Sequence, residues 1–322
     1  MSLFNTLSGT NIFDLNIEKR FWTQAFQFNK DSALPLLFRE VGDVIDLNGK
    51  TFLDRSVEEA ARLFEEIAEG TEEVVTLDPR TVARMKSYSR EYGLGVKVTE
   101  RVMNTRGKDY ILKYTDRFPE LAYRTIEKDW VNYFINTGFT FNALRDQRDG
   151  VSLYNVAHPG GALGGVYANM PATASAITET SLSTAIGYFN AILDDSGLPY
   201  PLVTKKLIMV VHPTRYAVAV QVAKSMSSQT DYKNAGVLSL VKSYTLDITV
   251  LQSAYQTSPL QWSLFVMDRP SEMGGLETFF FKQPGTVQKK VNQDPNWLKW
   301  YSIMDYGLAV SDPRVAYSNP GA

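Results

Sequence analysis

Cysteine is absent from this sequence of 322 residues, and histidine occurs only twice, as His158 and His212. Without cysteine the chain has no disulfide, no thiolate ligand for zinc and no thiol nucleophile, which is usual for proteins made in a reducing cytosol. The two histidines do not stand in a recognisable metal-ligand spacing, so a metal site would depend on carboxylates. We therefore expect no metal and no cofactor.

Long apolar segments and an excess of one charge are also missing. No segment approaches the roughly 18 apolar residues that cross a bilayer, and the first residues lack the basic start and apolar run of a signal peptide. The formal net charge of −2 argues against general coating of nucleic acid, which needs clustered lysine and arginine. Instead, 44% of the residues are hydrophobic and 21% are charged, which predicts a soluble chain with a sizeable core.

Motifs of common enzyme sites are absent too. The chain has no phosphate-binding GxxxxGK[ST] loop, no GxSxG nucleophile elbow and no HExxH zinc helix. The one suggestive stretch is the glycine-rich loop 158–165, HPGGALGG, which begins with His158. A soluble α+β enzyme with a site in this loop is one alternative, and a structural crossing in which His158 is a loop or packing residue is the other. We predict that the protein is not an enzyme.

The clearest helix signal covers residues 118–137. Large apolar side chains recur at every fourth position on one face, and the charged residues fall largely off that face. Pro119 suits the first turn of a helix, where no amide hydrogen is needed. A stripe of this kind is typical of a helix packed on a core and not of a cofactor site. The predicted core residues of the stripe are Phe118, Ala122, Ile126, Trp130 and Phe134.

Other patterns complete an α+β chain. Helical periodicity also occurs at 57–68 and at 181–195. A buried strand is predicted at 207–211, and Pro213 separates it from a further helix. From residue 245 onward, short β-rich runs between turn residues predict antiparallel strands late in the chain. The further helix is expected to bury Tyr216, Ala217, Val220 and Ala223.

Two neighbouring segments carry opposite charge. The charged residues of 58–78 are all acidic apart from Arg62, and the charged residues of 80–108 are mainly basic. One interpretation is a solvated surface, because exposed ion pairs contribute little individually. The other is an arm that pairs with copies of itself, with the two runs facing each other between subunits. The candidate contact residues are Glu65, Glu66, Glu72, Glu73, Arg80, Arg84 and Arg90.

Taken in order, these segments resemble the major capsid proteins of tailed bacteriophages. The similarity covers roughly residues 85–315, and it is greatest to the branch related to the Mu-type major head subunit. It depends on a DG…L….HP segment after the 118–137 helix, then a D..G.P segment, then a buried strand that ends at a proline. The matching residues here are Asp149, Gly150, Leu153, His158, Pro159, Asp195, Gly197, Pro199 and Pro213.

The resemblance implies the Hong-Kong-ninety-seven capsid fold, an α+β fold whose parts are called the N-terminal arm, E-loop, P-domain and A-domain. An extended E-loop is usual in that family, and the helical period at 57–68 departs from it. For this chain the resemblance implies an arm at 1–35, a P-domain part at 36–149, an A-domain at 150–285 and a C-terminal return to the P-domain at 286–322. Within the P-domain part, the E-loop would lie at about 45–95 and the spine helix at about 118–137.

The function implied by the resemblance is structural. Identical subunits would form pentamers and hexamers that close into an icosahedral head around double-stranded DNA, which the inner face would contact without sequence specificity. Further implied partners are a portal protein, a separate scaffolding protein and a decoration or cement protein. The subunit would be made in the bacterial host cytoplasm and would end in the virion capsid. An encapsulin-like compartment that holds cargo protein is a further alternative.

Overall fold

The computed structural model describes most of the chain from residue 80 onward and two short stretches before it. The chain divides into two compact units, and each is described by itself. No helix within the described ranges is long and apolar enough to cross a membrane. The described residues are 45–47, 50–59, 80–99, 101–102, 105, 108–146, 149–159, 166–193, 206–227, 248–266, 276–291, 297–310 and 312–322.

Helices and strands are both present throughout the described ranges. The helices are α3 (Lys108–Thr115), α4 (Phe118–Val131), the π-helical η2 (Asn132–Asn136), α5 (Glu179–Ala191), η3 (Pro213–Arg215), α6 (Tyr216–Ser227) and η5 (Pro313–Val315). The strands are β1 (Ile45–Leu47), β2 (Lys50–Glu59), β3 (Arg80–Tyr88), β4 (Arg90–Thr99), β5 (Leu207–Val211), β6 (Ile248–Gln252), β7 (Trp262–Val266), β8 (Leu276–Val291), β9 (Trp297–Val310) and β10 (Ala316–Asn319). This mixture confirms the α+β class.

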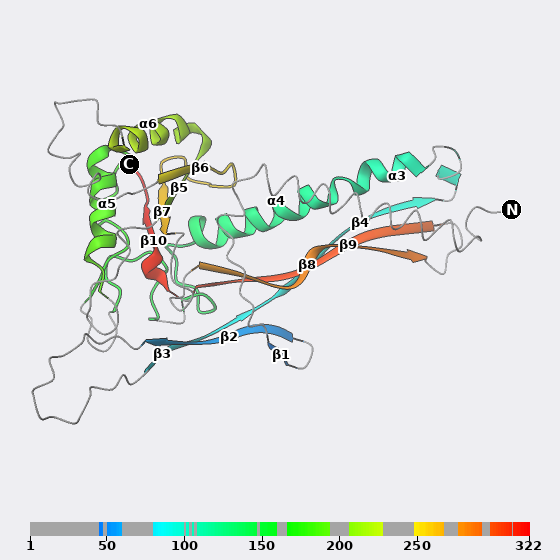
Figure 1. Cartoon of the computed structure of the whole chain (residues 1–322), viewed down its shortest axis with the longest axis horizontal. Coiled ribbons are helices and arrows are strands. Elements are labelled where there is room, and N and C mark those ends of the chain that lie inside the picture. Colours follow the sequence, from blue (N-terminus) through cyan, green and yellow to red (C-terminus); the bar gives the residue numbers. More distant parts are fainter. Residues whose placement is uncertain are drawn as a thin grey trace, which may run out of the picture. The chain divides into compact units, whose positions relative to one another are not determined.

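The first unit combines the spine helix with a sheet of order β4-β9-β8. Figure 1 shows α4 running along β4 and β9, and Ile126 of α4 packs with Met304 and Tyr306 of β9. The side chains of Tyr92 and Tyr306 stack with 5.0 Å between ring centroids. Alternate residues of β9 therefore face the helix, as the two-residue period of a strand requires.

A shared hydrogen-bond acceptor fixes the helix to both strands. The hydroxyls of Tyr92 and Tyr306 donate to the same Asp129 oxygen, Oδ2, at 2.7 and 2.6 Å. Burial, reinforced by the Asp129 carboxylate, raises the pKa of both hydroxyls, so both keep the protons that they donate. Asp129 thus joins α4, β4 and β9 through one carboxylate.

The helix stripe is buried along most of its length. Phe118, Ile126, Trp130 and Phe134 are buried, and Ala122 is half-buried. Leu121, on the same helix, is 40% exposed. After Val131 the helix widens into η2, where Thr137 N–H donates to Asn132 O at 3.0 Å. Such π-helical turns shift the side-chain register, and sequence periodicity did not predict this one.

The second unit contains a sheet of order β10-β7-β5-β6 with α5 and α6. Strand β5 is buried throughout, in agreement with the predicted strand at 207–211. Helix α5 starts with a capping box between Thr178 and Ser181 and ends at Ala191, before the predicted end at 195. The prediction that the late strands are antiparallel is wrong for β6, which pairs parallel to β5. The crossover that a parallel pair needs contains α6.

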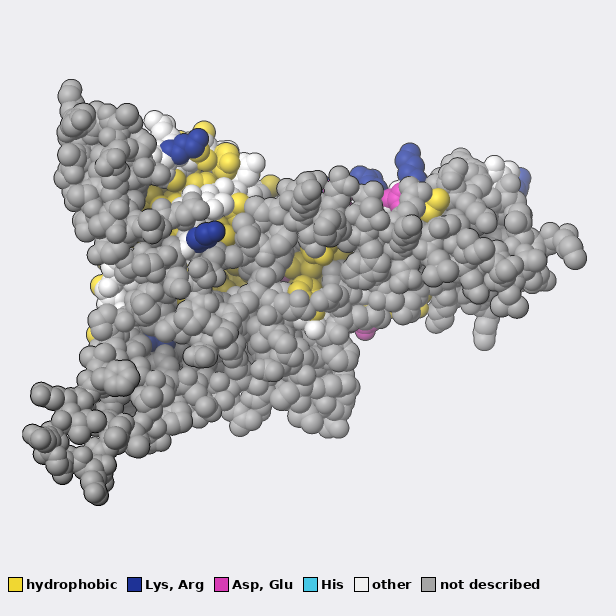
Figure 2. All heavy atoms as spheres, in the orientation of Figure 1, with side chains coloured by type: hydrophobic (Ala, Val, Ile, Leu, Met, Phe, Trp, Pro, Cys, Tyr) yellow, Lys and Arg dark blue, Asp and Glu magenta, His cyan; other side chains and the backbone are white. Residues whose placement is uncertain are grey.

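Helix α6 packs only in part through the residues expected, of which Ala223 is confirmed as buried and Val220 is half-buried. Ala219 and Ala223 are buried, whereas Tyr216 is 38% exposed and Ala217 is exposed, so the predicted burial of these two is wrong. Because alanine is small, the helix can approach β5 and β6 closely along this face. Figure 2 shows hydrophobic and basic side chains side by side over α6.

Two further expectations are corrected by strands. Residues 57–59 belong to β2 and are extended, not helical, while residues 60–68 lie outside the described residues. The short runs expected from residue 245 onward are in one place a single long strand, since β8 continues through Pro284 to Val291. Strand β8 is at the edge of its sheet, where proline is tolerated because no neighbouring strand needs its amide hydrogen.

Truncation of the stripe should destabilise the subunit before it affects assembly. Trp130 and Phe134 contact each other edge to face at 5.0 Å, and both are fully buried. We expect Trp130→Ala and Phe134→Ala each to lower the free energy of unfolding by about 3–5 kcal/mol. Leu121→Ala is the exposed control on the same helix and should cost much less. Denaturant unfolding of the full-length subunit measures this, and unchanged unfolding of both aromatic variants would contradict it.

Candidate functional site

The end of the spine helix is closed by a buried ion pair. Arg145 and Asp146 have side chains that are 0% and 1% exposed, and Arg145 Nε lies 2.7 Å from Asp146 Oδ1. In a second hydrogen bond, Arg145 Nη2 donates to Asp146 Oδ2 at 3.0 Å. Asn142 N–H also donates to Asp146 Oδ2, at 2.7 Å. This pairing supplies the counter-charge without which burial of a guanidinium would be prohibitive.

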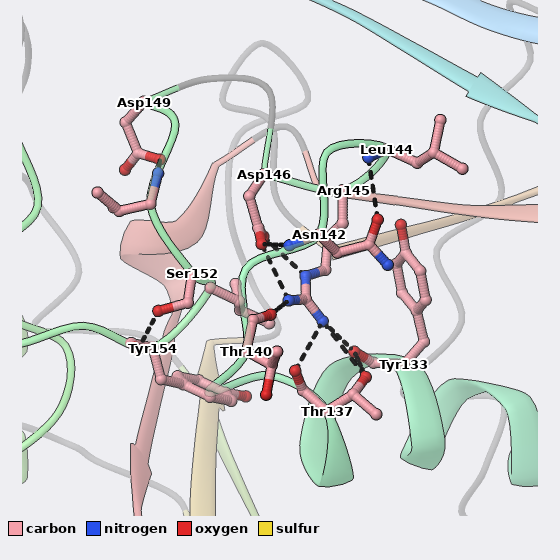
Figure 3. Close-up of polar contacts among 12 residues, drawn as sticks. Tyr133, Thr137, Thr140, Asn142, Leu144, Arg145, Asp146, Asp149, Ser152 and Tyr154 are labelled. Carbon is pink, nitrogen blue, oxygen red and sulfur yellow. Dashed lines mark hydrogen bonds and ion pairs between the residues drawn. The ribbon is translucent and has the colours of Figure 1, made fainter.

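The same guanidinium donates hydrogen bonds to carbonyl groups at and just beyond the helix end. Arg145 donates to the carbonyl oxygens of Tyr133 at 2.7 Å, Thr137 at 3.3 Å and Thr140 at 2.5 Å (Figure 3). The last carbonyls of any helix lack intrahelical donors, and burial makes that lack costly. Arg145 also lies over the Tyr133 ring, 5.4 Å from its centroid. It therefore acts as a buried C-terminal cap.

Tight packing beside this cap depends on a glycine. A Cβ atom at Gly138 would lie 2.5 Å from the Tyr154 ring, closer than side chains approach. Tyr154 N–H donates to Gly138 O at 3.0 Å, so backbone and ring both fit against this position. Burial raises the pKa of the Tyr154 hydroxyl. The chain leaves the helix through a closely packed turn.

A second polar cluster follows, around His158. The imidazole is fully buried, with Nδ1 2.5 Å from Asp149 Oδ2 and Nε2 3.0 Å from Asn169 Oδ1. Its ring stacks on Tyr167, and the backbones of these two residues form an isolated antiparallel bridge. Gly150, next to Asp149, has a φ of +72°, a conformation that favours glycine. The structure thus brings together Asp149 and His158 of the DG…L….HP segment.

The C-terminal segment joins this cluster through hydrogen bonds. Asn169 Nδ2 donates to Leu153 O at 2.6 Å and to Pro313 O at 3.3 Å, and Ser318 N–H donates to Asn169 O. A third buried ion pair lies at Asp312 and Arg314, 2.9 Å apart, and Arg314 Nη1 also donates to Leu193 O. We use "polar junction" for Arg145, Asp146, Asp149, His158, Asn169, Asp312 and Arg314.

The geometry of the polar junction is that of a structural element. Among the described residues, no three histidine, aspartate or glutamate side chains gather as metal ligands. Both ring nitrogens of His158 are engaged, and its burial leaves no room for a substrate beside it. Residues 160–165 of the glycine-rich loop lie outside the described residues. The arrangement fits the alternative in which His158 packs and positions backbone.

The charge-run residues are placed only in part. Arg80 and Arg84 belong to β3 and Arg90 to β4, where Arg90 is exposed. The acidic candidates Glu65, Glu66, Glu72 and Glu73 lie outside the described residues, as does the arm at 1–35. The contact between the two runs therefore stays a prediction, as do the domain boundaries taken from the resemblance.

Sequence reasoning missed most of the polar junction. Five of its residues were not singled out: Arg145, Asp146, Asn169, Asp312 and Arg314. An adjacent Arg-Asp pair directly after a predicted helix is a usable signal, because helix ends need donors. Asn169 offered no such signal, since its partners Leu153 and Pro313 are far from it in sequence.

Comparison with known proteins gives a family match. Residues 87–319 match the model of a family described as phage capsid protein. No curated protein matches at a significant level.

Solved capsids share the fold at low sequence identity. The capsid of cyanophage P-SCSP1u has a TM-score of 0.51 at 11% identity, over 88% of this chain and 85% of that one. The capsid of Ralstonia phage GP4 gives 0.50 at 12%, over 89% and 87%. Mycobacterium phage Patience gives 0.51 at 9%, over 94% and 86%. The resemblance to tailed-phage capsids is confirmed, and the Mu-type branch stays a prediction.

Loss of the buried cap should be costly. Arg145→Met leaves the buried Asp146 carboxylate without its counter-charge and removes one donor from each of several carbonyls, and breaking a buried pair costs about 3–5 kcal/mol of unfolding free energy. The double variant Arg145→Met/Asp146→Leu should be less destabilised than Arg145→Met alone, because no unpaired carboxylate remains.

Arg124→Met provides the matched control, because it breaks the exposed Glu120–Arg124 pair on the same helix. That loss should stay below about 1 kcal/mol. Chemical denaturation of the three proteins compares them directly. Equal losses for Arg124→Met and Arg145→Met would show that Arg145 is not an essential cap.

Proposed function

The chain belongs to the phage capsid protein family and is a major capsid protein of a head shell, and from this premise we propose that its copies form pentamers and hexamers that close into an icosahedral head around double-stranded DNA. The observation that carries the proposal is the family match over residues 87–319, and the shared fold supports it. Membership of this family implies a structural and not an enzymatic role. The virion capsid is its location.

A closed shell requires each subunit to bind its neighbours in more than one arrangement. Identical surfaces must bond in slightly different settings around rings of five and six, so a rigid body with adaptable contacts is favoured. The buried polar junction supplies rigidity in the second unit. Exposed residues such as Arg90 in the first unit and Lys224 in the second are available for contacts.

The remaining partners belong to the same proposal. A portal protein and a separate scaffolding protein would take part in assembly, a decoration or cement protein would bind outside, and packaged DNA would lie against the inner face. Assembly would take place in the bacterial host cytoplasm. The particle contents separate this from an encapsulin-like compartment, since a phage head holds DNA and a compartment holds cargo protein.

Particle mass tests self-assembly. We expect the protein, expressed with its assembly partners, to sediment as capsomers or as particles in the megadalton range. A small discrete oligomer under all conditions would contradict the proposal and return the enzyme alternative with a site at 158–165.

The charge runs provide a test of how subunits contact one another. If the acidic run of one subunit meets the basic run of its neighbour, reversing Glu65, Glu66, Glu72 and Glu73 to lysine should leave the subunit folded but impair assembly. Added reversals Arg80→Glu, Arg84→Glu and Arg90→Glu should restore assembly at least in part.

Particle yield and its salt dependence measure the effect, because exposed pairs weaken as salt rises. Circular dichroism and thermal unfolding serve as the control for folding. Normal particles from the quadruple reversal, with unaltered salt tolerance, would assign the two runs to a solvated surface.

A further inference from the structure

The two ring nitrogens of His158 both face oxygen atoms. Nδ1 lies 2.5 Å from Asp149 Oδ2, and Nε2 lies 3.0 Å from Asn169 Oδ1. A neutral imidazole has one N–H donor and one bare nitrogen that can only accept. A neutral ring would therefore direct a lone pair at an oxygen on one of its two sides, inside the protein and away from water.

The Asn169 amide cannot be turned to remove this conflict. Its Nδ2 donates to the carbonyls of Leu153 and Pro313, and its Oδ1 accepts from Asn155 N–H at 2.8 Å. Rotating the amide by half a turn would point its oxygen at two carbonyl oxygens and its NH2 group at the Asn155 N–H. Three hydrogen bonds fix Oδ1 as the atom that faces His158.

The Asp149 side is also fixed as an acceptor. Asp149 Oδ1 accepts from Val151 N–H at 3.3 Å, and Oδ2 faces the imidazole, so both carboxylate oxygens have donors nearby. The Asp149 side chain is 9% exposed. On its flat face the ring meets the Tyr167 side chain, parallel within 8° and 4.8 Å away. The described groups that face His158 are thus one carboxylate, one amide oxygen and one aromatic ring.

From these contacts we propose that His158 is doubly protonated in the folded subunit and forms a buried imidazolium–carboxylate latch with Asp149. One N–H donates to Asp149, and the other donates to Asn169. Through Asn169 the latch extends to Leu153 and to Pro313 of the C-terminal segment. The inference concerns the second unit of the single subunit and holds independently of the number of subunits in a capsomer.

The latch depends on both ring protons of His158. Removal of one proton takes away the charge that balances Asp149 and one of the two N–H donors. Residues 149–159 and 166–169 are the part of the chain that such a loss would loosen.

The protein offers its own reference for a test, because it has only two histidines. His212 Nδ1 accepts from Thr214 N–H at 3.3 Å, so the geometry assigns this nitrogen as the bare one. His212→Asn keeps a side-chain cap for η3 and leaves His158 as the sole histidine. Nuclear magnetic resonance of full-length protein labelled with 15N in histidine then assigns each ring without ambiguity.

Near neutral pH we expect the His158 ring to show two protonated nitrogens and the His212 ring to show one protonated and one bare nitrogen. The wild-type spectrum and that of His212→Asn are sufficient for this measurement. A bare ring nitrogen on His158 would overturn the proposal.

Two carboxylate variants separate the latch from a purely structural role. Asp149→Asn should lower the melting temperature and also convert His158 to a ring with one bare nitrogen. Asp146→Asn should lower the melting temperature while the His158 signals keep two protonated nitrogens, because Asp146 pairs with Arg145 instead. A His158 ring that stays doubly protonated in Asp149→Asn would refute Asp149 as its counter-ion.

Discussion

Carbonyl groups at the end of a buried helix must find hydrogen-bond donors inside the protein, and in this subunit the Arg145 guanidinium provides three of these hydrogen bonds. Its bonds to the carbonyls of Tyr133, Thr137 and Thr140 close the spine helix, and Asp146 neutralises its charge. The close turn at Gly138 follows from this closure, because the chain must fold back over the helix end to place Arg145 there. Removal of Arg145 would therefore take a hydrogen bond from several buried groups together.

Buried pairs of an acidic and a basic side chain also occur beyond the helix. Asp149 with His158, and Asp312 with Arg314, are further buried pairs whose remaining donors bind backbone carbonyls or Asn169. Buried pairs contribute specificity of geometry more readily than net stability. In a capsid subunit such specificity has a clear use, since every copy must present the same body while its surface contacts adapt to rings of different size.

Local patterns predicted the regular elements well. The four-residue spacing from Phe118 to Phe134 predicted the spine helix, and the β-branched run at 207–211 predicted β5. Features that depend on distant partners were not predictable: the parallel pairing of β6, the orientation of α6 through Ala219, and the π-helical turn after Val131. A loop or packing role was one of two interpretations of His158, and Asn169, which faces it, gave no local signal. Hydrogen-bond networks of this kind are set by tertiary contacts and not by periodicity.

Electron cryomicroscopy of particles from the purified protein, assembled with its natural partners, tests the central claim most directly. The account predicts closed shells in which rings of five and rings of six are built from this one chain, with the Arg145–Asp146 and Asp149–His158 pairs buried identically in both kinds of ring. Discrete small oligomers without closed shells would contradict it, as would shells in which these pairs are broken in one kind of ring.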